Sequence, residues 1–339
     1  MRFFTVLHGA RQRRASSQFR MTHCEKGQEK MDKRFKCGFV LLLVAVFLAP
    51  AAQAVTGLPQ DYVKYPVMVS LDSGNSASGF YFNDNHGGIY LVTAAHVLFN
   101  VESGKADPPL RAARALLLSY PEEDLPEPVY MELDLNKLKQ QGLLGRHPTE
   151  DAAAVLIGHT EGEGTERKIA LSDGVQRKAH STEAGAGTIL GAHAGMTRSF
   201  DQVAIGNEVY TFGFPTSLGI EKYPQIDYKR PLLRKGIIAG KNPDKKTLIL
   251  DCTTHHGNSG GPVIEVIENS PTDTSFWLIG MVTEYIPFEN KQYIGRHGKL
   301  KLSNLENSGY SVVLPTDVIL ELVAGIPAHA NPAQPAEKK

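Results

Sequence analysis

Short apolar segments separated by turn-forming residues recur between residues 65 and 314, and they constrain the fold more than any other feature of this sequence. Each has the length of a β-strand, and several alternate between apolar and polar residues. The segments are 65–71, 78–83, 89–93, 114–120, 128–135, 153–157, 208–214, 235–239, 247–252, 261–266, 276–282 and 310–314. Many short strands joined by loops favour antiparallel barrels or sandwiches over a parallel sheet with crossover helices.

Four other segments are of a different kind. Asp84 to Gly88 read DNHGG, a hairpin signal between two of the predicted strands. A helical turn is expected within 133–143, and a C-terminal helix is expected over 316–323, behind Pro315 and ending near Gly325. Residues 160–199 are rich in Gly, Ala, Ser, Thr and His without a steady period, which predicts a linker between two halves.

The N-terminal region 1–54 has the three parts of a secretory signal peptide. It contains ten Lys and Arg against three Asp and Glu, then an apolar run at 37–49, and then Ala52-Gln53-Ala54. We therefore expect cleavage after Ala54; an uncleaved anchor is the alternative, although the run is short for a membrane span. Because Met31 begins a sufficient basic segment, residues 1–30 are either a long basic region or an over-extended start.

The remaining composition limits location and partners. The whole chain carries 36 Lys and Arg against 36 Asp and Glu, which argues against a nucleic-acid partner. Cys24 and Cys37 would leave with the signal, so Cys252 would stand alone without a possible internal disulfide. This is typical of a bacterial periplasmic or secreted protein, with no membrane association after cleavage. Cys252 is interpreted as a small buried side chain rather than a reactive thiol.

The string GNSGGP at 257–262 carries the strongest chemical signal. Its glycines permit a tight turn that would expose the hydroxyl of Ser259. The same turn can aim the backbone amides of Gly257 and Ser259 at one point, where an oxyanion would form. A serine hydroxyl is a weak nucleophile, so this interpretation requires a neighbouring base.

His96 is the predicted base and Asp151 the predicted orienting acid. His96 follows a predicted strand in LVTAAHVL at 91–98, an apolar setting in which an imidazole needs a partner. Asp151 precedes the apolar run AAAVLI at 152–157, where an unpaired carboxylate would be costly. Asp134 and Glu150 are the alternative acids.

The strings TAAH, DAAAVLI and GNSGGP, in that order, resemble the trypsin-like (chymotrypsin-fold) serine peptidases of the bacterial exported type. The resemblance covers roughly residues 65–324, and Ser78-Gly79-Phe80 before the histidine is a supporting match. It implies an all-β fold of two six-stranded antiparallel β-barrels with a C-terminal helix. The implied boundaries are 55–195 for the first barrel and linker and 196–326 for the second barrel and helix. The Ala- and Pro-rich composition of residues 327–339 predicts a disordered tail.

The resemblance also implies roles for residues. Ser259 would attack a peptide carbonyl with His96 as base and Asp151 as its orienting acid, and Gly257 and Ser259 would form the oxyanion hole. Neither a metal nor another cofactor is implied, and the partner is a protein or peptide substrate. The substrate-binding positions implied are Thr253, Thr254, His256, Thr283 and Tyr285.

The chain departs from the activated digestive members of that family at Asn258. That residue is neutral, so it cannot form the ion pair with a newly freed N-terminus that activates them. The specificity pocket has no acid at its implied base, which argues against a preference for Arg or Lys. Two alternatives to an endopeptidase remain: a catalytically silent binding module on the same fold, and an esterase with the same triad.

Overall fold

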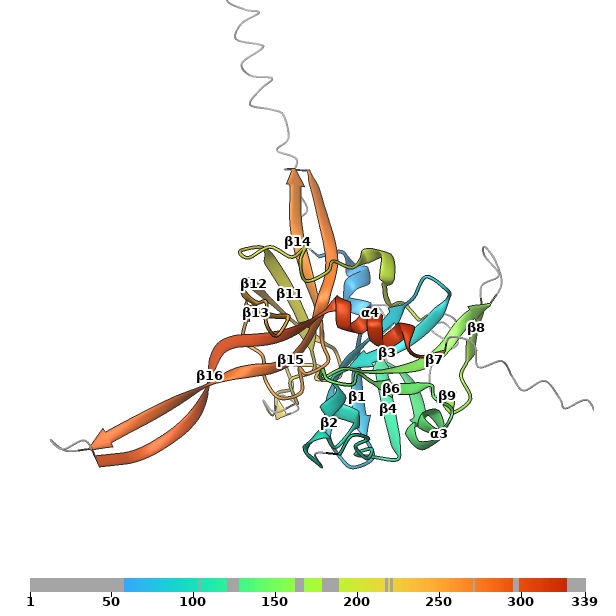
Figure 1. Ribbon diagram of the computed structural model, residues 1–339, viewed down its shortest axis with the longest axis horizontal. Helices are drawn as coiled ribbons and strands as arrows, with labels where there is room; N and C mark the ends of the chain where they lie inside the picture. Colours follow the sequence, from blue (N-terminus) through green and yellow to red (C-terminus); the bar gives the residue numbers. More distant parts are fainter. Residues whose placement is uncertain are drawn as a thin grey trace, which may run out of the picture. The chain divides into compact units, whose positions relative to one another are not determined.

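A computed structural model describes residues 58–103, 105–120, 128–161, 168–178, 189–216, 219, 222–270, 272–294 and 299–327 (Figure 1). Contacts divide the chain into two units, Met1–Gln53 and Ala54–Lys339, and every described residue belongs to the second. The predicted signal peptide, its cleavage after Ala54, and the predicted tail beyond Pro327 lie outside the described residues. None of the helices within these ranges has the length and apolar character needed to cross a membrane.

The first sheet has ten strands. In sheet order its main path is β6-β7-β3-β2-β1-β4-β5-β9, while β8 pairs with β7 and β10 with β2. The strands are β1 (Pro66–Leu71), β2 (Ser76–Asn83), β3 (Gly88–Thr93), β4 (Arg114–Ser119), β5 (Val129–Asp134), β6 (Leu144–Arg146), β7 (Ala153–Glu161), β8 (Lys168–Leu171), β9 (Val175–Arg177) and β10 (Ala192–His193). Short helices lie before, between or after them in sequence: η1 (Gln60–Lys64), α2 (Ala95–Leu98), η2 (Val101–Ser103), α3 (Leu135–Gln140) and η5 (Ala194–Met196).

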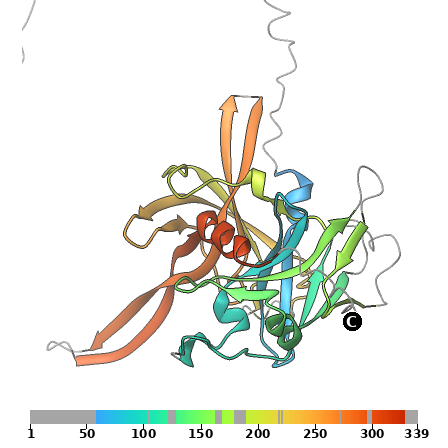
Figure 2. The same cartoon turned by 45° about the vertical axis from the view of Figure 1, so that its right-hand side comes forward.

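The second sheet closes into a six-stranded barrel in the order β11-β12-β13-β16-β15-β14. Its strands are β11 (Glu208–Gly213), β12 (Leu232–Asn242), β13 (Thr247–Asp251), β14 (Pro262–Ser270), β15 (Asp273–Ile294) and β16 (Lys299–Pro315), followed by helix α4 (Thr316–Ala324). Strands β15 and β16 run on beyond the barrel as a two-stranded hairpin, drawn in orange to red in Figure 1 and seen from a second angle in Figure 2. We call residues 287–307 the hairpin arm.

The predicted all-β architecture with a C-terminal helix is confirmed, and the helix begins at Thr316 with Gly325 as its C-cap. The first sheet has more strands than the six expected, because β6, β8, β9 and β10 are only two to four residues long. Segments this short show no readable alternation. The segment 160–199, predicted as a linker between the two halves, contains three of these short strands, β8, β9 and β10.

Helix α4 follows the second barrel in sequence and packs on both that barrel and the first sheet. Its buried residues Ile319, Leu322 and Val323 belong to the same apolar cluster as the first-sheet strands β3 and β7. A Cβ placed on Gly145 of β6 would lie 3.4 Å from Ile326, so the helix end fits closely over this strand. The helix therefore ties the second barrel to the first sheet by apolar burial.

A buried ion pair fixes the segment that leads into the second barrel. The carboxylate of Glu265 on β14 is fully buried and lies 2.6 Å from Nη1 of Arg198. Nδ2 of Asn207 donates to the same carboxylate at 2.7 Å, and the carbonyl of Arg198 accepts from Thr316 Oγ1 at 2.5 Å. Because each buried charge has partners, the desolvation cost of burying this pair is offset.

Candidate active site

Register between β3 and β7 brings His96 and Asp151 together. Thr93 at the end of β3 pairs with Ala153 at the start of β7, so the residues just beyond each end are neighbours. Asp151 Oδ2 lies 2.7 Å from His96 Nδ1, and the backbone N–H of His96 donates to Oδ1 at 2.9 Å. A carboxylate can only accept, so Nδ1 carries the proton and Nε2 is left as an acceptor.

The two alternative acids have other partners. Asp134 caps helix α3, where its Oδ1 accepts from the backbone N–H of Lys137 at 3.0 Å. Glu150 accepts from the hydroxyl of Thr149 at 3.1 Å. The geometry therefore favours Asp151 as the carboxylate that orients His96.

The turn that presents Ser259 requires glycine. Gly257 has φ +100° and Gly260 has φ +86°, both in the left-handed region. A Cβ on Gly257 would lie 2.3 Å from the carbonyl oxygen of Phe214, so no side chain fits there. The Ser259 hydroxyl donates to the carbonyl of Thr283 at 3.0 Å in this structure, which makes Thr283 a direct neighbour of this hydroxyl.

The backbone amides of Gly257 and Ser259 are available to a ligand: neither donates to an acceptor in the described part of the chain. The peptide after Gly257 is held by Ser78, whose hydroxyl donates to the Gly257 carbonyl at 2.6 Å and accepts from the Phe214 N–H at 2.9 Å. Fixed N–H groups of this kind are what an oxyanion hole needs. Sequence reasoning gave Ser78 no such role, although a serine in the apolar string SGFYF must find a buried partner.

A cavity of about 420 Å³ joins residues of both sheets beside Ser259. It is lined by His96, Asp151, Thr254, His255, His256, Ser259, Val282, Thr283, Glu284, Tyr285 and Pro287. Most of the residues predicted for catalysis or substrate binding are thus brought together. Gly257 lines an adjoining cavity instead, and Thr253 lines neither of the two.

Thr254 contributes a hydroxyl group to the lining of this cavity. Its side chain is buried and lies 2.9 Å from the hydroxyl of Ser311, which in turn donates to the carbonyl of Cys252 at 2.5 Å. Of the acidic lining residues, Asp151 is held by His96 and Glu284 is exposed. The groups around Thr254 are therefore polar but uncharged.

Two rings flank the cavity. His256 and Tyr285 meet edge to face with their centroids 5.4 Å apart. His255 also lines the cavity, and its burial lowers its pKa below the ordinary value. Electrostatic repulsion from Arg234 and His256 lowers this pKa further, by smaller amounts. His255 is therefore neutral at pH 7, and its protonation needs a more acidic medium than an ordinary histidine does.

The adjoining cavity reveals a residue that sequence reasoning missed. Its lining includes His96, His256, Gly257 and Ser259 together with Arg111 from the loop after α2. Arg111 Nε donates to the carbonyl of Phe99 at 3.0 Å, which fixes the side chain beside the cavity. No periodic or turn signal marks Arg111, so only the folded loop could place it.

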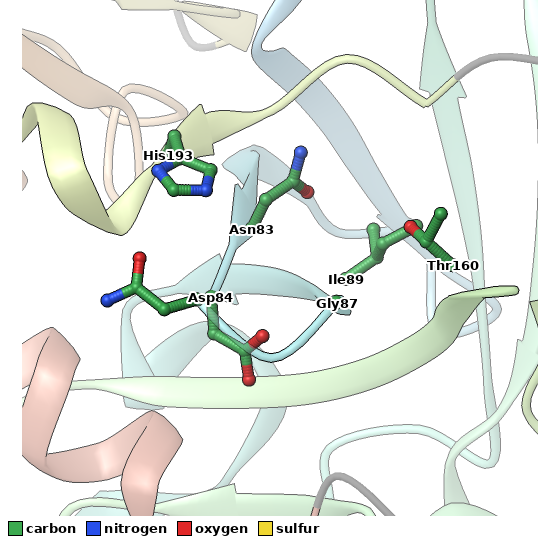
Figure 3. Close-up of a pocket in the computed structure, with 7 residues that line it drawn as sticks. Asn83, Asp84, Gly87, Ile89, Thr160 and His193 are labelled. Carbon is green, nitrogen blue, oxygen red and sulfur yellow. The ribbon is translucent and has the colours of Figure 1, made fainter. Parts of the chain in front are cut away.

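A further cavity lies between the β2–β3 turn and β10 (Figure 3). Asn83 Oδ1 in its lining is buried without a hydrogen-bond partner among the described residues, but other polar groups are engaged locally. Asp84 Oδ1 accepts from the backbone N–H groups of His86 and Gly88, and His193 Nδ1 accepts from that of Gly195. These contacts hold the loops themselves, and across the described ranges no three His, Cys, Asp or Glu side chains gather as a metal site requires.

The sequence around this site is similar to a known protein family. The model of the trypsin-like peptidase domain matches residues 77–269, which include His96, Asp151 and Ser259. No curated protein matches.

Three solved structures are similar to this chain. A variant of the HtrA-type protease AlgW with a tripeptide is 16% identical with a TM-score of 0.40, and the match covers 77% of this chain and 59% of that chain. A thermostable serine protease, AL20, from an extremophilic microorganism is 12% identical with a TM-score of 0.36, and the match covers 72% and 91%. Human heparin binding protein is 10% identical with a TM-score of 0.42, and the match covers 81% and 96%. The chain thus spans 59% of the length of the AlgW structure. Because the family model spans more than half of the sequence, this chain belongs to the trypsin-like peptidase domain family.

Proposed function

We propose that this protein is an exported serine endopeptidase that uses His96, Asp151 and Ser259 as a triad. The observation that carries the proposal is the double contact of one carboxylate with His96, through the ring and through the backbone, beside a serine whose turn leaves two amides free. Membership of a peptidase family supports the same conclusion.

In the proposed mechanism, a substrate carbonyl enters beside Ser259 and the hydroxyl leaves the Thr283 carbonyl. As the bond from Oγ to the carbonyl carbon forms, the hydroxyl proton passes to Nε2 of His96, and Asp151 stabilises the imidazolium. The N–H groups of Gly257 and Ser259 stabilise the oxyanion. His96 then gives the proton to the leaving amine, and a water molecule activated by His96 releases the acyl group from Ser259.

Export is part of the proposal. The basic segment and apolar run within residues 1–54 would direct the chain out of a bacterial cytoplasm, with cleavage after Ala54. The protein would then act in the periplasm or outside the cell on protein or peptide substrates.

Labelling with a fluorophosphonate probe tests the proposal. The exported protein should react at about one probe per chain, since the probe requires an activated serine. Ser259→Ala, with an unchanged circular dichroism spectrum, should not react. Absence of labelling in folded wild-type protein would overturn the proposal. It would favour the silent binding module. The hydroxyl of Ser259 donates to the carbonyl of Thr283 rather than to His96, as that alternative would allow.

Cleavage by this peptidase is not expected after Arg or Lys. The hydroxyl groups of Thr254 and Ser311 offer no negative charge to a basic side chain. Desolvating such a side chain there would cost free energy without compensation. A peptide library read by mass spectrometry should show small or medium apolar residues before the cleaved bond. A profile dominated by Arg and Lys would contradict this interpretation of the cavity.

Arg111 is expected to favour substrates with an acidic residue just after the cleaved bond. Its guanidinium lines the cavity next to Gly257 and Ser259, where that part of the substrate would lie. Arg111→Gln should reduce kcat/KM for peptides with Asp at that position by about 5–10-fold, corresponding to a partly exposed charge contact. Arg114→Gln is the matched control, because Arg114 pairs with Glu132 and does not line this cavity. Equal losses for acidic and neutral peptides would contradict the prediction.

A further inference from the structure

The turn that carries Asp151 is folded around the side chain of His147. The imidazole is buried, and its Nδ1 accepts from the backbone N–H of Glu150 at 3.0 Å and, more weakly, of Thr149 at 3.4 Å. The backbone N–H of His147 donates to the carbonyl of Ala152 at 2.8 Å. One residue thus holds both sides of a short turn through its main chain and its ring.

The other ring nitrogen faces helix α4. Because Nδ1 accepts, the neutral ring carries its proton on Nε2. Nε2 is buried and has no hydrogen-bond partner among the described residues, but it lies 3.6 Å from the carboxylate of Glu321. This distance is beyond a hydrogen bond and short enough for attraction between the N–H and a carboxylate. Helix α4 therefore lies next to the His147 ring, on the side opposite the turn.

The placement of Asp151 depends on this turn. Both of its carboxylate oxygens are used on His96, and its own backbone groups have no hydrogen bond in the described part of the chain. Its position is therefore set by its neighbours, whose N–H groups are held by His147 Nδ1. Arg146 supports the same turn by donating to the carbonyls of His147 and Pro148, at 3.0 and 3.3 Å.

We propose that His147 is a positioning residue that sets the Asp151 carboxylate against His96. The inference rests on the proposed function only in taking Asp151 and His96 as a catalytic pair; the geometry of the turn does not depend on it. Loss of the ring would let the turn relax, and misplacement of a catalytic group by about 1 Å can cost on the order of 10²-fold in rate.

Two substitutions test this role. His147→Leu should lower kcat by about 10–100-fold with KM nearly unchanged. It should also reduce the share of the neutral His96 ring that carries its proton on Nδ1, because a displaced carboxylate no longer accepts from that nitrogen. His147→Asn keeps an acceptor oxygen at the position of Nδ1 and should restore both quantities most of the way. If the leucine variant keeps the wild-type tautomer of His96, or the asparagine variant is no better than leucine, the proposal fails.

The tautomer of His96 is measured from its ring ¹⁵N shifts in the resting protein, which needs no turnover. A change in His147→Leu that His147→Asn reverses would support the positioning role even if the wild-type protein proved inactive and the proposed function failed. Ile238→Val is the control for lost stability, because this substitution is destabilising and lies in the separate apolar core of the second barrel. It should leave the tautomer of His96 unchanged.

A measurement on the unmodified protein covers the case in which the leucine variant does not fold. The ring ¹⁵N shifts of His147 should show the tautomer with the proton on Nε2, since Nδ1 accepts from Glu150 and Thr149. A proton on Nδ1 in the neutral ring would overturn the proposal, because that nitrogen could then not hold the turn.

Discussion

Alanine at both Ser259 and His96 is expected to lower kcat by about 10⁶-fold, and no further than alanine at Ser259 alone. The two side chains act as one unit, because the hydroxyl is a competent nucleophile only while Nε2 can take its proton. The comparison is made on one peptide substrate, with kcat and KM determined separately. KM should stay close to wild type, since neither substitution changes the hydroxyl groups of Thr254 and Ser311.

The control for this experiment is the single Ser259→Ala variant, purified in parallel to exclude contaminating peptidases. A double variant that is much slower than the single variant would show that His96 contributes to residual activity by another route. A Ser259→Ala variant that retains substantial activity would contradict the assignment of the nucleophile.

Asp151→Asn is expected to lower kcat by about 10⁴-fold. Both oxygens of Asp151 accept N–H groups of His96, but an asparagine offers only one accepting oxygen. If that oxygen keeps the backbone N–H, the amide NH₂ faces Nδ1 and forces the ring proton onto Nε2. The imidazole then cannot accept the proton of Ser259.

The matched control is Asp134→Asn, which changes the same atoms at the N-cap of α3. Asparagine is as good an N-cap as aspartate, so stability and kcat should remain near wild type. The measurement is the pH profile of kcat/KM for both variants. A loss of less than about tenfold in Asp151→Asn would mean that this carboxylate does not orient the base.

Most of the strands could be predicted because burial requires apolar residues in a regular pattern or an unbroken run along each of them. β3 is buried at every position and its centre is an unbroken apolar run, and β7 begins in the same way two residues after Asp151. The glycines of the turn with Ser259 were equally recognisable, since they approach backbone atoms at distances that exclude any side chain. Local sequence therefore selected His96, Asp151 and Ser259 as candidates, and the fold places His96 and Asp151 in contact and Ser259 beside the same cavity.

Residues that act through distant contacts could not be predicted. His147 sits in an ordinary turn, and its partner Glu321 comes from a helix at the other end of the chain. Arg111 acquires its place only through the folded loop and the carbonyl of Phe99. No local period or spacing carries information of this kind.

The hairpin arm was missed for a different physical reason. Its pairing is supported by polar cross-strand contacts, such as Asn290 to Glu306 at 2.9 Å and Ser303 to Glu289 at 2.6 Å. Phe288 and Leu305 are largely exposed in it. None of the side chains at 287–291 and 303–307 is buried, and such segments give neither the alternation nor the apolar run by which strands are recognised.

The packing of α4 against the first sheet has a consequence for biosynthesis. A ribosome makes the Asp151 turn early and α4 last among the described elements, although Ile326 and Glu321 contact β6 and His147. The turn can acquire its full set of contacts only after the polypeptide has been synthesised through α4. A nascent chain that lacks α4 would therefore hold the Asp151 turn, and with it the contact of Asp151 with His96, less firmly than the complete chain does.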